Sequence, residues 1–148
     1  MPTFAENYRA ADLTFDDNGI YWVNPENDET YQVMMDWEQP IMDKMAELCV
    51  SEGDDVLEIG FGMGILSDAI QSKKPKSHTI VECHKDIIPR LKEWAKDKPN
   101  VTIIEGLWIE VLDEYGKYDC ILQDTYGDEY RHALRPLVER HAKSTCKV

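Results

Sequence analysis

The sequence predicts an α/β protein of the Rossmann-like class, with a mostly parallel sheet and helices on both faces. From residue 55 onward, short apolar runs rich in Val and Ile alternate with segments of helical periodicity. The first of these runs ends in the string GFGMG at 60–64, which is typical of a tight turn between a strand and a helix. Strands that alternate with helices form parallel sheets, because each helix crosses over one face of the sheet.

The expected elements divide the chain into an acidic arm at 1–32 and an α/β domain at 33–148. Turn signals fill the arm, so we expect only short helical or strand pieces there. A helical pattern starts at Val33, and Pro40 fits the first position of a helix, which places the helix itself at 40–50. Strands are expected at 55–60, 78–82, 101–105 and 118–123, and a further one from 145. Helices are expected at 63–73, 86–97 (with Asp86 as N-cap), 109–114 and 128–143.

The composition of the 148 residues restricts the function classes. The formal net charge is −13, from 16 Lys and Arg against 29 Asp and Glu, which argues against a nucleic-acid partner because phosphate contacts need clustered cations. An acidic surface suits a cationic substrate, and it also serves solubility. No apolar run approaches the length of a membrane span and no signal peptide is present, so we expect a cytoplasmic protein without a membrane partner. The four cysteines are expected to be reduced, and no metal-ligand spacing is found.

The glycine string and the acid that follows it predict a site for an adenosine-containing cofactor. Backbone N–H groups in such a turn can approach an anion. Glu82, roughly 20 residues further on at a strand end, can accept hydrogen bonds from ribose hydroxyls. A dinucleotide motif would need its third glycine at position 65, where this chain has Ile65. We therefore favour S-adenosyl-L-methionine over NAD, with a purely structural glycine turn as the other alternative.

Further candidate residues follow other predicted strands. Ligands of open α/β sheets bind beyond the carboxyl ends of the strands, where residues 105–108 and Asp124 are expected beside the glycine turn. Leu107 and Trp108 offer an apolar wall for an adenine ring, with ordinary core packing as the alternative for Trp108. The sequence therefore predicts one ligand site at this edge of the sheet.

Five strings distributed over about two-thirds of the chain suggest a family. They are VMMDWEQPIM (33–42), GFGMGI (60–65), ECH (82–84), GLW (106–108) and DTY (124–126). Together they resemble the guanidino N-methyltransferases of the class I S-adenosylmethionine-dependent fold, namely guanidinoacetate N-methyltransferase and the protein arginine delta-N-methyltransferases of fungi and plants. The ECH and GLW strings lean toward the guanidinoacetate enzyme, and VMM and GMGI lean toward the protein arginine enzymes.

The resemblance also has consequences for completeness. Sheets of this class normally have seven strands, so it implies that the C-terminal strands are missing and that this is a fragment, or that a second chain covers the open edge, as in a homo-oligomer. It also suggests that the arm at 1–32 is a lid over the substrate, with a disordered tail as the alternative.

The resemblance implies a guanidino site and a cofactor site. Guanidino binding and catalysis fall to Glu38 and Asp124. A guanidinium is a poor nucleophile, and two carboxylates can hold its planar fork and accept its proton. A helix N-terminal acid is the alternative for Glu38, and a loop cap the alternative for Asp124. The implied cofactor residues are Met34, Met42, Gly60, Phe61, Gly62, Met63, Gly64, Ile65, Leu66, Glu82, Cys83, His84, Gly106 and Leu107.

These observations lead to one expected function and two alternatives. We expect an S-adenosylmethionine-dependent N-methyltransferase of a guanidino group, with guanidinoacetate or a similar small guanidine as the first choice of substrate. The alternative within enzymes is a protein arginine N-methyltransferase acting on an arginine-containing peptide. The alternative from another class is a non-catalytic S-adenosylmethionine-binding module that needs a partner chain.

Overall fold

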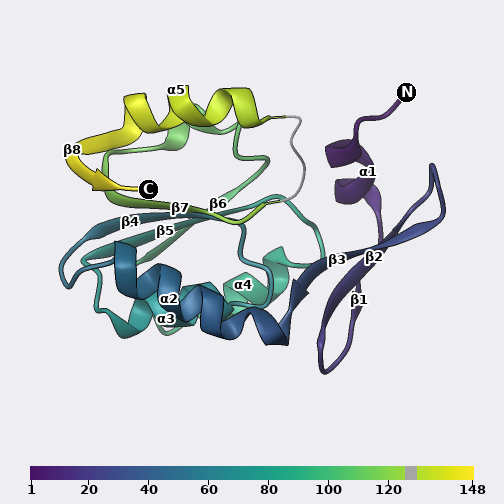
Figure 1. The fold of residues 1–148 in the computed structure, drawn as a ribbon, viewed down its shortest axis with the longest axis horizontal. Coiled ribbons are helices and arrows are strands. Elements are labelled where there is room, and N and C mark those ends of the chain that lie inside the picture. Colours follow the sequence, from purple (N-terminus) through teal and green to yellow (C-terminus); the bar gives the residue numbers. More distant parts are fainter. Residues whose placement is uncertain (126–129) are drawn as a thin grey trace.

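A five-stranded parallel sheet forms the centre of the molecule. The computed structural model describes residues 1–125 and 130–148. The strands lie in the order β6-β5-β4-β7-β8, and each neighbouring pair is parallel (Figure 1). The prediction of a mostly parallel sheet is therefore confirmed. The strand bounds are β4 Asp55–Ile59, β5 Ser77–Glu82, β6 Val101–Glu105, β7 Tyr118–Gln123 and β8 Ala142–Lys147.

Helices cover both faces of the sheet. Helix α5 lies on one face, while α2, α3 and α4 lie on the other (Figure 1). Strand β4 has a largely apolar sequence because helices cover both of its faces. Its residues Val56, Leu57 and Ile59 are at most 1% exposed. The helix bounds are α2 Gln39–Cys49, α3 Ile65–Ser72, α4 Ile88–Ala95 and α5 Arg131–His141.

The N-terminal arm is more ordered than the sequence indicates. It contains helix α1 (Phe4–Ala10) and an antiparallel sheet of β1 (Thr14–Phe15), β2 (Gly19–Asn24) and β3 (Glu29–Met35), and a 3₁₀ turn η1 (Asp36–Glu38) follows. Strand β3 runs across the division expected between residues 32 and 33.

The prediction of helical structure from Val33 is wrong, because residues 33–35 end strand β3 and helix α2 begins at Gln39. The helical spacing of Met34, Trp37 and Ile41 is misleading. Met34 is buried by the hairpin and by α2, while Trp37 and Ile41 are 60% and 52% exposed, so these residues do not form one buried helix face.

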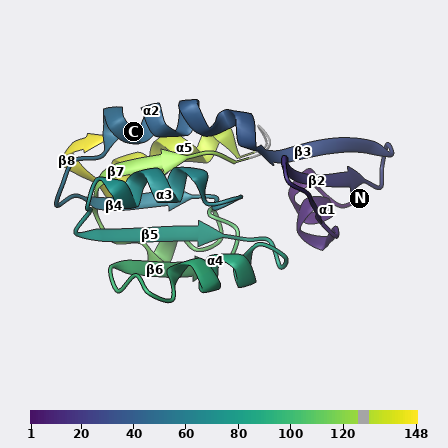
Figure 2. The same cartoon turned by 90° about the horizontal axis from the view of Figure 1, so that it is seen from below.

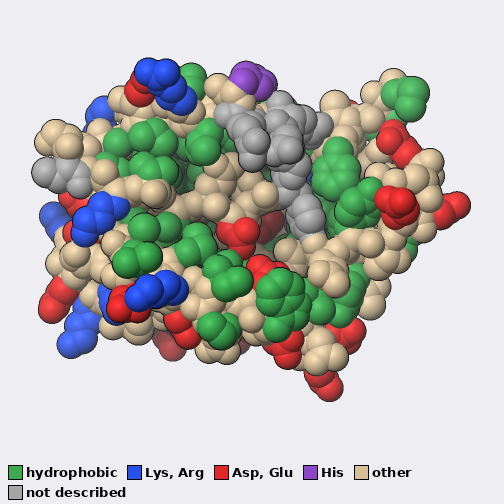
Figure 3. Space-filling model, in the orientation of Figure 1, with side chains coloured by type: hydrophobic (Ala, Val, Ile, Leu, Met, Phe, Trp, Pro, Cys, Tyr) green, Lys and Arg blue, Asp and Glu red, His purple; other side chains and the backbone are tan. Residues whose placement is uncertain are grey.

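The arm is attached across the carboxyl ends of the parallel strands (Figure 2). The Leu13 backbone N–H donates to Asp86 Oδ2 at 2.9 Å, and the Arg90 guanidinium lies 3.7 Å from the centre of the Phe15 ring. Asp86 was expected to cap helix α4. Its carboxylate instead holds the arm, and the N-cap position belongs to Ile87, whose side chain makes no capping bond. Acidic side chains are spread over the arm (Figure 3).

Three element boundaries differ from expectation. Helix α5 ends at His141 and passes directly into β8 at Ala142, three positions before residue 145. The expected start of that helix at 128–129 lies outside the described residues. In place of a helix at 109–114 there is one 3₁₀ turn, η2 (Leu112–Glu114). Within the described part of the chain, no helix has the length and apolar character needed to cross a bilayer.

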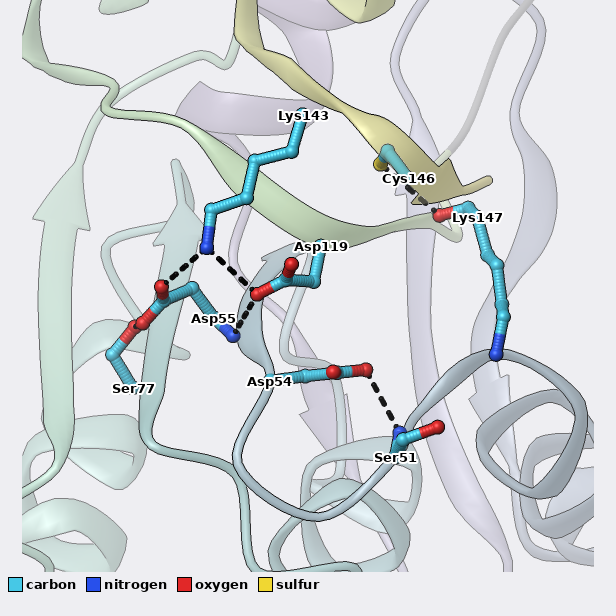
Figure 4. Close-up of polar contacts among 8 residues, drawn as sticks. All are labelled: Ser51, Asp54, Asp55, Ser77, Asp119, Lys143, Cys146 and Lys147. Carbon is cyan, nitrogen blue, oxygen red and sulfur yellow. Dashed lines mark hydrogen bonds and ion pairs between the residues drawn. The ribbon is translucent and has the colours of Figure 1, made fainter.

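A group of charged side chains ties strand β8 to the start of the sheet. Lys143 Nζ lies 2.8 Å from Asp55 Oδ2 and 2.8 Å from Asp119 Oδ2 (Figure 4). Asp119 also accepts the backbone N–H of Asp55 at 2.8 Å, and Asp55 accepts the Ser77 hydroxyl at 2.6 Å. The Lys143 ammonium is the main cause of a lowered pKa at Asp55, while the Asp55 backbone N–H, followed by Lys143, lowers the pKa of Asp119. This group lies at the amino ends of the strands, away from the carboxyl ends where the arm is attached.

Candidate functional site

A cavity of about 340 Å³ lies between the carboxyl ends of the parallel strands and the arm. Its volume falls in the range of small-molecule sites, roughly 300–1,000 Å³. Figure 3 shows acidic side chains in the hollow between the α/β domain and the arm, with hydrophobic side chains beside them. Ten of the residues singled out from the sequence line this cavity: Met34, Glu38, Gly60, Gly62, Glu82, Cys83, Gly106, Leu107, Trp108 and Asp124.

The glycine turn needs glycine for steric reasons. Gly60 has φ +92°, and a Cβ there would lie 2.8 Å from the carbonyl oxygen of Asp124. Gly64 has φ +82° as the N-cap residue of α3, and its Cβ would lie 2.9 Å from the Phe61 ring. Side chains at these positions would push the turn away from β7 and from its own aromatic residue. The strand end of β7 and the start of α3 can therefore come close only with glycine in the turn.

Glu82 is fixed at the base of the cavity by backbone donors. Its Oε2 accepts the N–H of Phe61 at 2.9 Å, and its Oε1 accepts the N–H groups of Cys83 and His84, each at 2.9 Å. Burial raises the pKa of this carboxyl, while the backbone N–H groups act in the opposite direction. The Gly62 backbone N–H also lowers the pKa of this carboxyl. A carboxylate has about four acceptor positions, so beside the three close backbone bonds one position can be shared with a ligand hydroxyl. The Glu82 side chain also lines the cavity, on the side of the β5 end.

The other predicted cofactor residues do not line this cavity. Some pack beneath the turn: Met42 and Leu66 are 3% and 2% exposed in the core between α2, α3 and the sheet. His84 is fully buried, its Nδ1 accepts the Asp86 N–H at 3.0 Å, and its ring centre is 4.7 Å from that of Tyr8. Met42, Leu66 and His84 therefore pack behind the site. For all seven predicted cofactor residues that do not line the cavity, a direct cofactor contact stays a prediction; they are Met42, Phe61, Met63, Gly64, Ile65, Leu66 and His84.

Glu38 and Asp124 line the cavity from different elements. Glu38 is the last residue of η1 and is half-buried; its Oε1 accepts the Met35 N–H at 3.1 Å. Through this bond Glu38 stabilises the 3₁₀ turn η1, whereas at the N-cap position of α2 its side chain makes no capping bond. Burial raises the pKa of Glu38, the Met35 N–H acts against this, and the charge of Asp124 raises it further. The charge of Asp124 therefore acts on Glu38 across the cavity.

Asp124 follows the end of β7 and remains accessible from the cavity. Its carboxylate accepts no hydrogen bond from residues 1–125 or 130–148, which does not favour the loop-cap alternative. The surrounding protein removes enough water to raise the pKa of this carboxyl. An acid that pairs with no described residue and lies in one cavity with a second acid is the arrangement that a bound cation would stabilise.

The described residues of the remaining wall are apolar. Ile59, Val81, Leu107 and Trp108 contribute hydrophobic surface near Glu82. The described lining residues include three carboxylates, and no Lys, Arg or His is among them. The described lining therefore suits a ligand group that is cationic or neutral better than an anionic one.

Helix α1 supplies a part of the site that was not expected from the sequence. Phe4, Ala5 and Tyr8 line the cavity opposite the sheet. A signal for this helix was present in the pattern Thr3-x-x-Glu6: the Thr3 hydroxyl accepts the Glu6 N–H at 3.2 Å, and the Glu6 carboxylate accepts the Thr3 N–H at 2.7 Å.

The parallel sheet with helices on both faces, and a glycine turn beside an acid at the next strand end, define a Rossmann-like methyltransferase fold. Residues 25–145 match the guanidinoacetate N-methyltransferase family. The chain belongs to this family of S-adenosylmethionine-dependent methyltransferases.

Known proteins similar to this chain include protein arginine N-methyltransferases of fungi. It is 38% identical over 135 residues to protein arginine N-methyltransferase 2 of Yarrowia lipolytica, covering 84% of this chain and 28% of that protein. It is 40% identical over 138 residues to the protein of the same name from Kluyveromyces lactis, covering 86% and 33%. The chain thus spans about a third or less of the length of these relatives.

Solved structures agree with the fold. A precorrin-6y C5,15-methyltransferase from Geobacter metallireducens superposes with a TM-score of 0.63 at 16% identity, covering 76% of this chain and 60% of that one. Aeropyrum pernix fibrillarin, solved with S-adenosyl-L-methionine, gives a TM-score of 0.59 at 12% identity, covering 90% and 74%.

Proposed function

We propose that this chain is the cofactor-binding part of a protein arginine N-methyltransferase that uses S-adenosyl-L-methionine. The acceptor is the guanidino group of an arginine residue in a polypeptide. This differs from the first expectation from sequence, which was a small guanidine such as guanidinoacetate. The relatives named protein arginine N-methyltransferase 2 support the change, and so does the chemistry of the cavity.

The residues present fit the cofactor. The glycine turn brings backbone N–H groups to the cavity, Glu82 has acceptor capacity for a ribose hydroxyl, and Leu107 and Trp108 offer an apolar wall for a base. When bound, S-adenosyl-L-methionine supplies an electrophilic methyl group. The chain's own contribution would be a partly enclosed pocket at the end of the sheet that holds the cofactor in the same cavity as Glu38 and Asp124.

Glu38 and Asp124 hold and activate the guanidinium. Two carboxylates can pair with the planar fork by charge-assisted hydrogen bonds, and either can take the proton that the attacking nitrogen loses. Their raised pKa values make them better proton acceptors than ordinary carboxylates. We assign orientation to Asp124 and the role of base or co-base to Glu38.

The absence of a cation from the described lining is the observation that favours polypeptide arginine. Guanidinoacetate carries a carboxylate next to its guanidino group, and a buried carboxylate needs a cationic or hydrogen-bonding partner. An arginine residue has three methylene groups and neutral peptide groups in that place. The cavity therefore suits the arginine side chain better than the small acid.

The test is a methyl-transfer assay with labelled S-adenosyl-L-methionine. We expect label in an arginine-containing peptide, none in the same peptide with Lys for Arg, and a kcat/KM for the peptide at least tenfold above that for guanidinoacetate. A preference for guanidinoacetate would contradict the proposal. Calorimetric binding of S-adenosylhomocysteine without turnover of any guanidine would favour the non-catalytic module instead.

A further inference from the structure

Trp37 is a large aromatic side chain left exposed at the cavity. It lines the cavity, yet 60% of its surface remains accessible. Tryptophan is on average one of the more buried residues, and exposed aromatic side chains beside a site are typical of partner contacts. The neighbouring Met34 and Met35 are 5% and 8% exposed, so Trp37 is the exposed one of these three large side chains.

Strand β3 brings its free edge to the same place. β3 pairs with β2 and with no other described strand, and it lies along the outer side of the arm (Figure 2). The pairing has a bulge: Ile20 pairs with Met34 and Tyr21 with Gln32, which leaves Val33 without a partner in register. Bulges bend a strand and redirect its side chains, commonly next to active sites. Gln32 and Val33 line the cavity, and with Trp37 they form what we term the rim surface.

The surroundings of the rim surface are strongly acidic. Asp36 and Glu38 flank Trp37 in the sequence, and Asp124 lies in the same cavity. Residues 1–38 contain nine acids and one base, Arg9, and Arg9 is paired with Glu110 at 3.2 Å. A positively charged polypeptide would be attracted to this side of the molecule, and an acidic one repelled.

We propose that the rim surface docks the polypeptide segment that carries the target arginine, and that this segment is rich in Lys and Arg. The inference rests on the proposed function. The Trp37 ring packs on the methylene groups of the target side chain or on a neighbouring cation, and the free edge of β3 bonds the adjoining peptide groups. The guanidinium then reaches Glu38 and Asp124. A small guanidine lacks the flanking groups that this surface binds.

The length of β3 sets a spacing for the basic residues. Strands rise about 3.4 Å per residue, so the four positions from Val33 to the exposed Glu29 correspond to roughly 13 Å. A peptide paired with this edge would place a residue about four positions from the target arginine near Glu29. We expect a Lys or Arg at that spacing to improve binding.

The experiment compares Trp37→Ala with a matched control, Leu48→Ala. Leu48 is 63% exposed near the C-terminal end of α2 and does not line the cavity. Three substrates are used: a blocked arginine amide, a Lys-flanked arginine peptide, and the same peptide with Glu in place of the flanking Lys residues. Initial rates give kcat and KM, and calorimetry gives peptide affinity in the presence of S-adenosylhomocysteine.

We compare kcat/KM for the Lys-flanked peptide with kcat/KM for arginine amide. We expect Trp37→Ala to lower this ratio about tenfold, because the KM for the peptide rises. Trp37→Phe should restore most of this ratio, Leu48→Ala should leave it unchanged, and the Glu-flanked peptide should bind more weakly. An unchanged ratio in Trp37→Ala, or no peptide binding to the wild type, would overturn the docking proposal. Turnover of arginine amide in the same experiment would still support the proposed function. Peptide binding that depends on Trp37 but without any methyl transfer would support the surface and contradict the function.

Discussion

Glu38 and Asp124 come from distant parts of the sequence and line one cavity, where the charge of Asp124 contributes to the raised pKa of Glu38. One carboxyl follows a hairpin and a 3₁₀ turn, and the other follows strand β7. Two like charges that face a shared space without a cation are unfavourable for the free protein and favourable for a cationic ligand. The proposed reaction depends on this relationship.

Neutralising either carboxylate should remove catalysis and leave the cofactor site intact. We expect Glu38→Gln and Asp124→Asn to lower kcat for arginine peptide methylation by about a hundredfold or more, because proton transfer and positioning are lost. The Kd of S-adenosylhomocysteine should stay within a few-fold in both, as measured by calorimetry. Comparable losses in cofactor affinity would show that these acids do not have the separate role assigned to them.

The electrostatic coupling of the two acids can be measured directly. In Asp124→Asn the pKa of Glu38 should fall, because a like charge is removed, but it should stay above the ordinary value of 4.5 because burial is its main cause. The measurement is a carbon-13 NMR titration of the Glu38 carboxyl. Asp113→Asn serves as the control, since the Asp113 side chain is 97% exposed and pairs with Arg140 at 3.6 Å. An equal shift in the control would contradict a specific interaction between Glu38 and Asp124.

The raised pKa values also predict the acid limb of the pH profile. Glu38 and Asp124 must both be ionised to bind the guanidinium. The pKa of Glu38 is raised above its ordinary 4.5 and that of Asp124 above its ordinary 3.8, so kcat/KM should decline as the pH falls through these raised values. The decline should therefore begin at a higher pH than for exposed carboxylates. A profile flat down to pH 4 would be incompatible with this assignment.

Glu82 should matter for both stability and cofactor binding. In Glu82→Gln the amide nitrogen would meet the backbone N–H donors of Phe61, Cys83 or His84, which destabilises a buried site by about 1–3 kcal/mol. We expect a lower free energy of unfolding in urea and a weaker Kd for S-adenosylhomocysteine. Glu105→Gln is the matched control at the next strand end: Glu105 is exposed and pairs with Lys92 at 3.1 Å, so little change is expected.

Gly60→Ala tests the close approach of the glycine turn to β7. A Cβ at φ +92° and 2.8 Å from the Asp124 carbonyl oxygen should cost about 1–3 kcal/mol in the free energy of unfolding. It should also displace Asp124 and lower peptide turnover. Gly116→Ala should be close to neutral, since its Cβ would meet nothing within 4 Å. Equal stability of the two variants would mean that the turn tolerates a side chain.

The Lys143 group predicts a pH-dependent stability. Its ammonium is the main cause of the lowered pKa of Asp55 and, after the Asp55 backbone N–H, lowers that of Asp119. The stabilisation is therefore present above their ordinary pKa of 3.8 and is lost as the pH falls through the lowered values. Urea unfolding of Lys143→Met should therefore show a stability deficit at neutral pH that shrinks below about pH 4. Lys147→Met is the control, because Lys147 makes no ion pair with any described residue. A deficit independent of pH would argue against the ion pairs as its source.

The sequence predicted the parallel sheet and the glycine turn because both depend on local patterns. Continuous apolar runs such as 56–59 indicate strands buried on both faces, and the glycine spacing indicates the turn. The hairpin of the arm was missed because Met34, Trp37 and Ile41 imitate a helical period. The role of Asp86 was missed because its partner, Leu13, is distant in sequence. Contacts of this kind depend on tertiary packing and leave no periodic signal.

The most direct test of the central claim is the binding of a blocked arginine amide in the presence of S-adenosylhomocysteine, measured by calorimetry for the wild type, Glu38→Gln and Asp124→Asn. We expect the wild type to bind the guanidinium and each variant to bind it at least tenfold more weakly. Equal affinity in all three proteins would show that Glu38 and Asp124 do not hold the guanidinium together, and the proposed function would have to be abandoned.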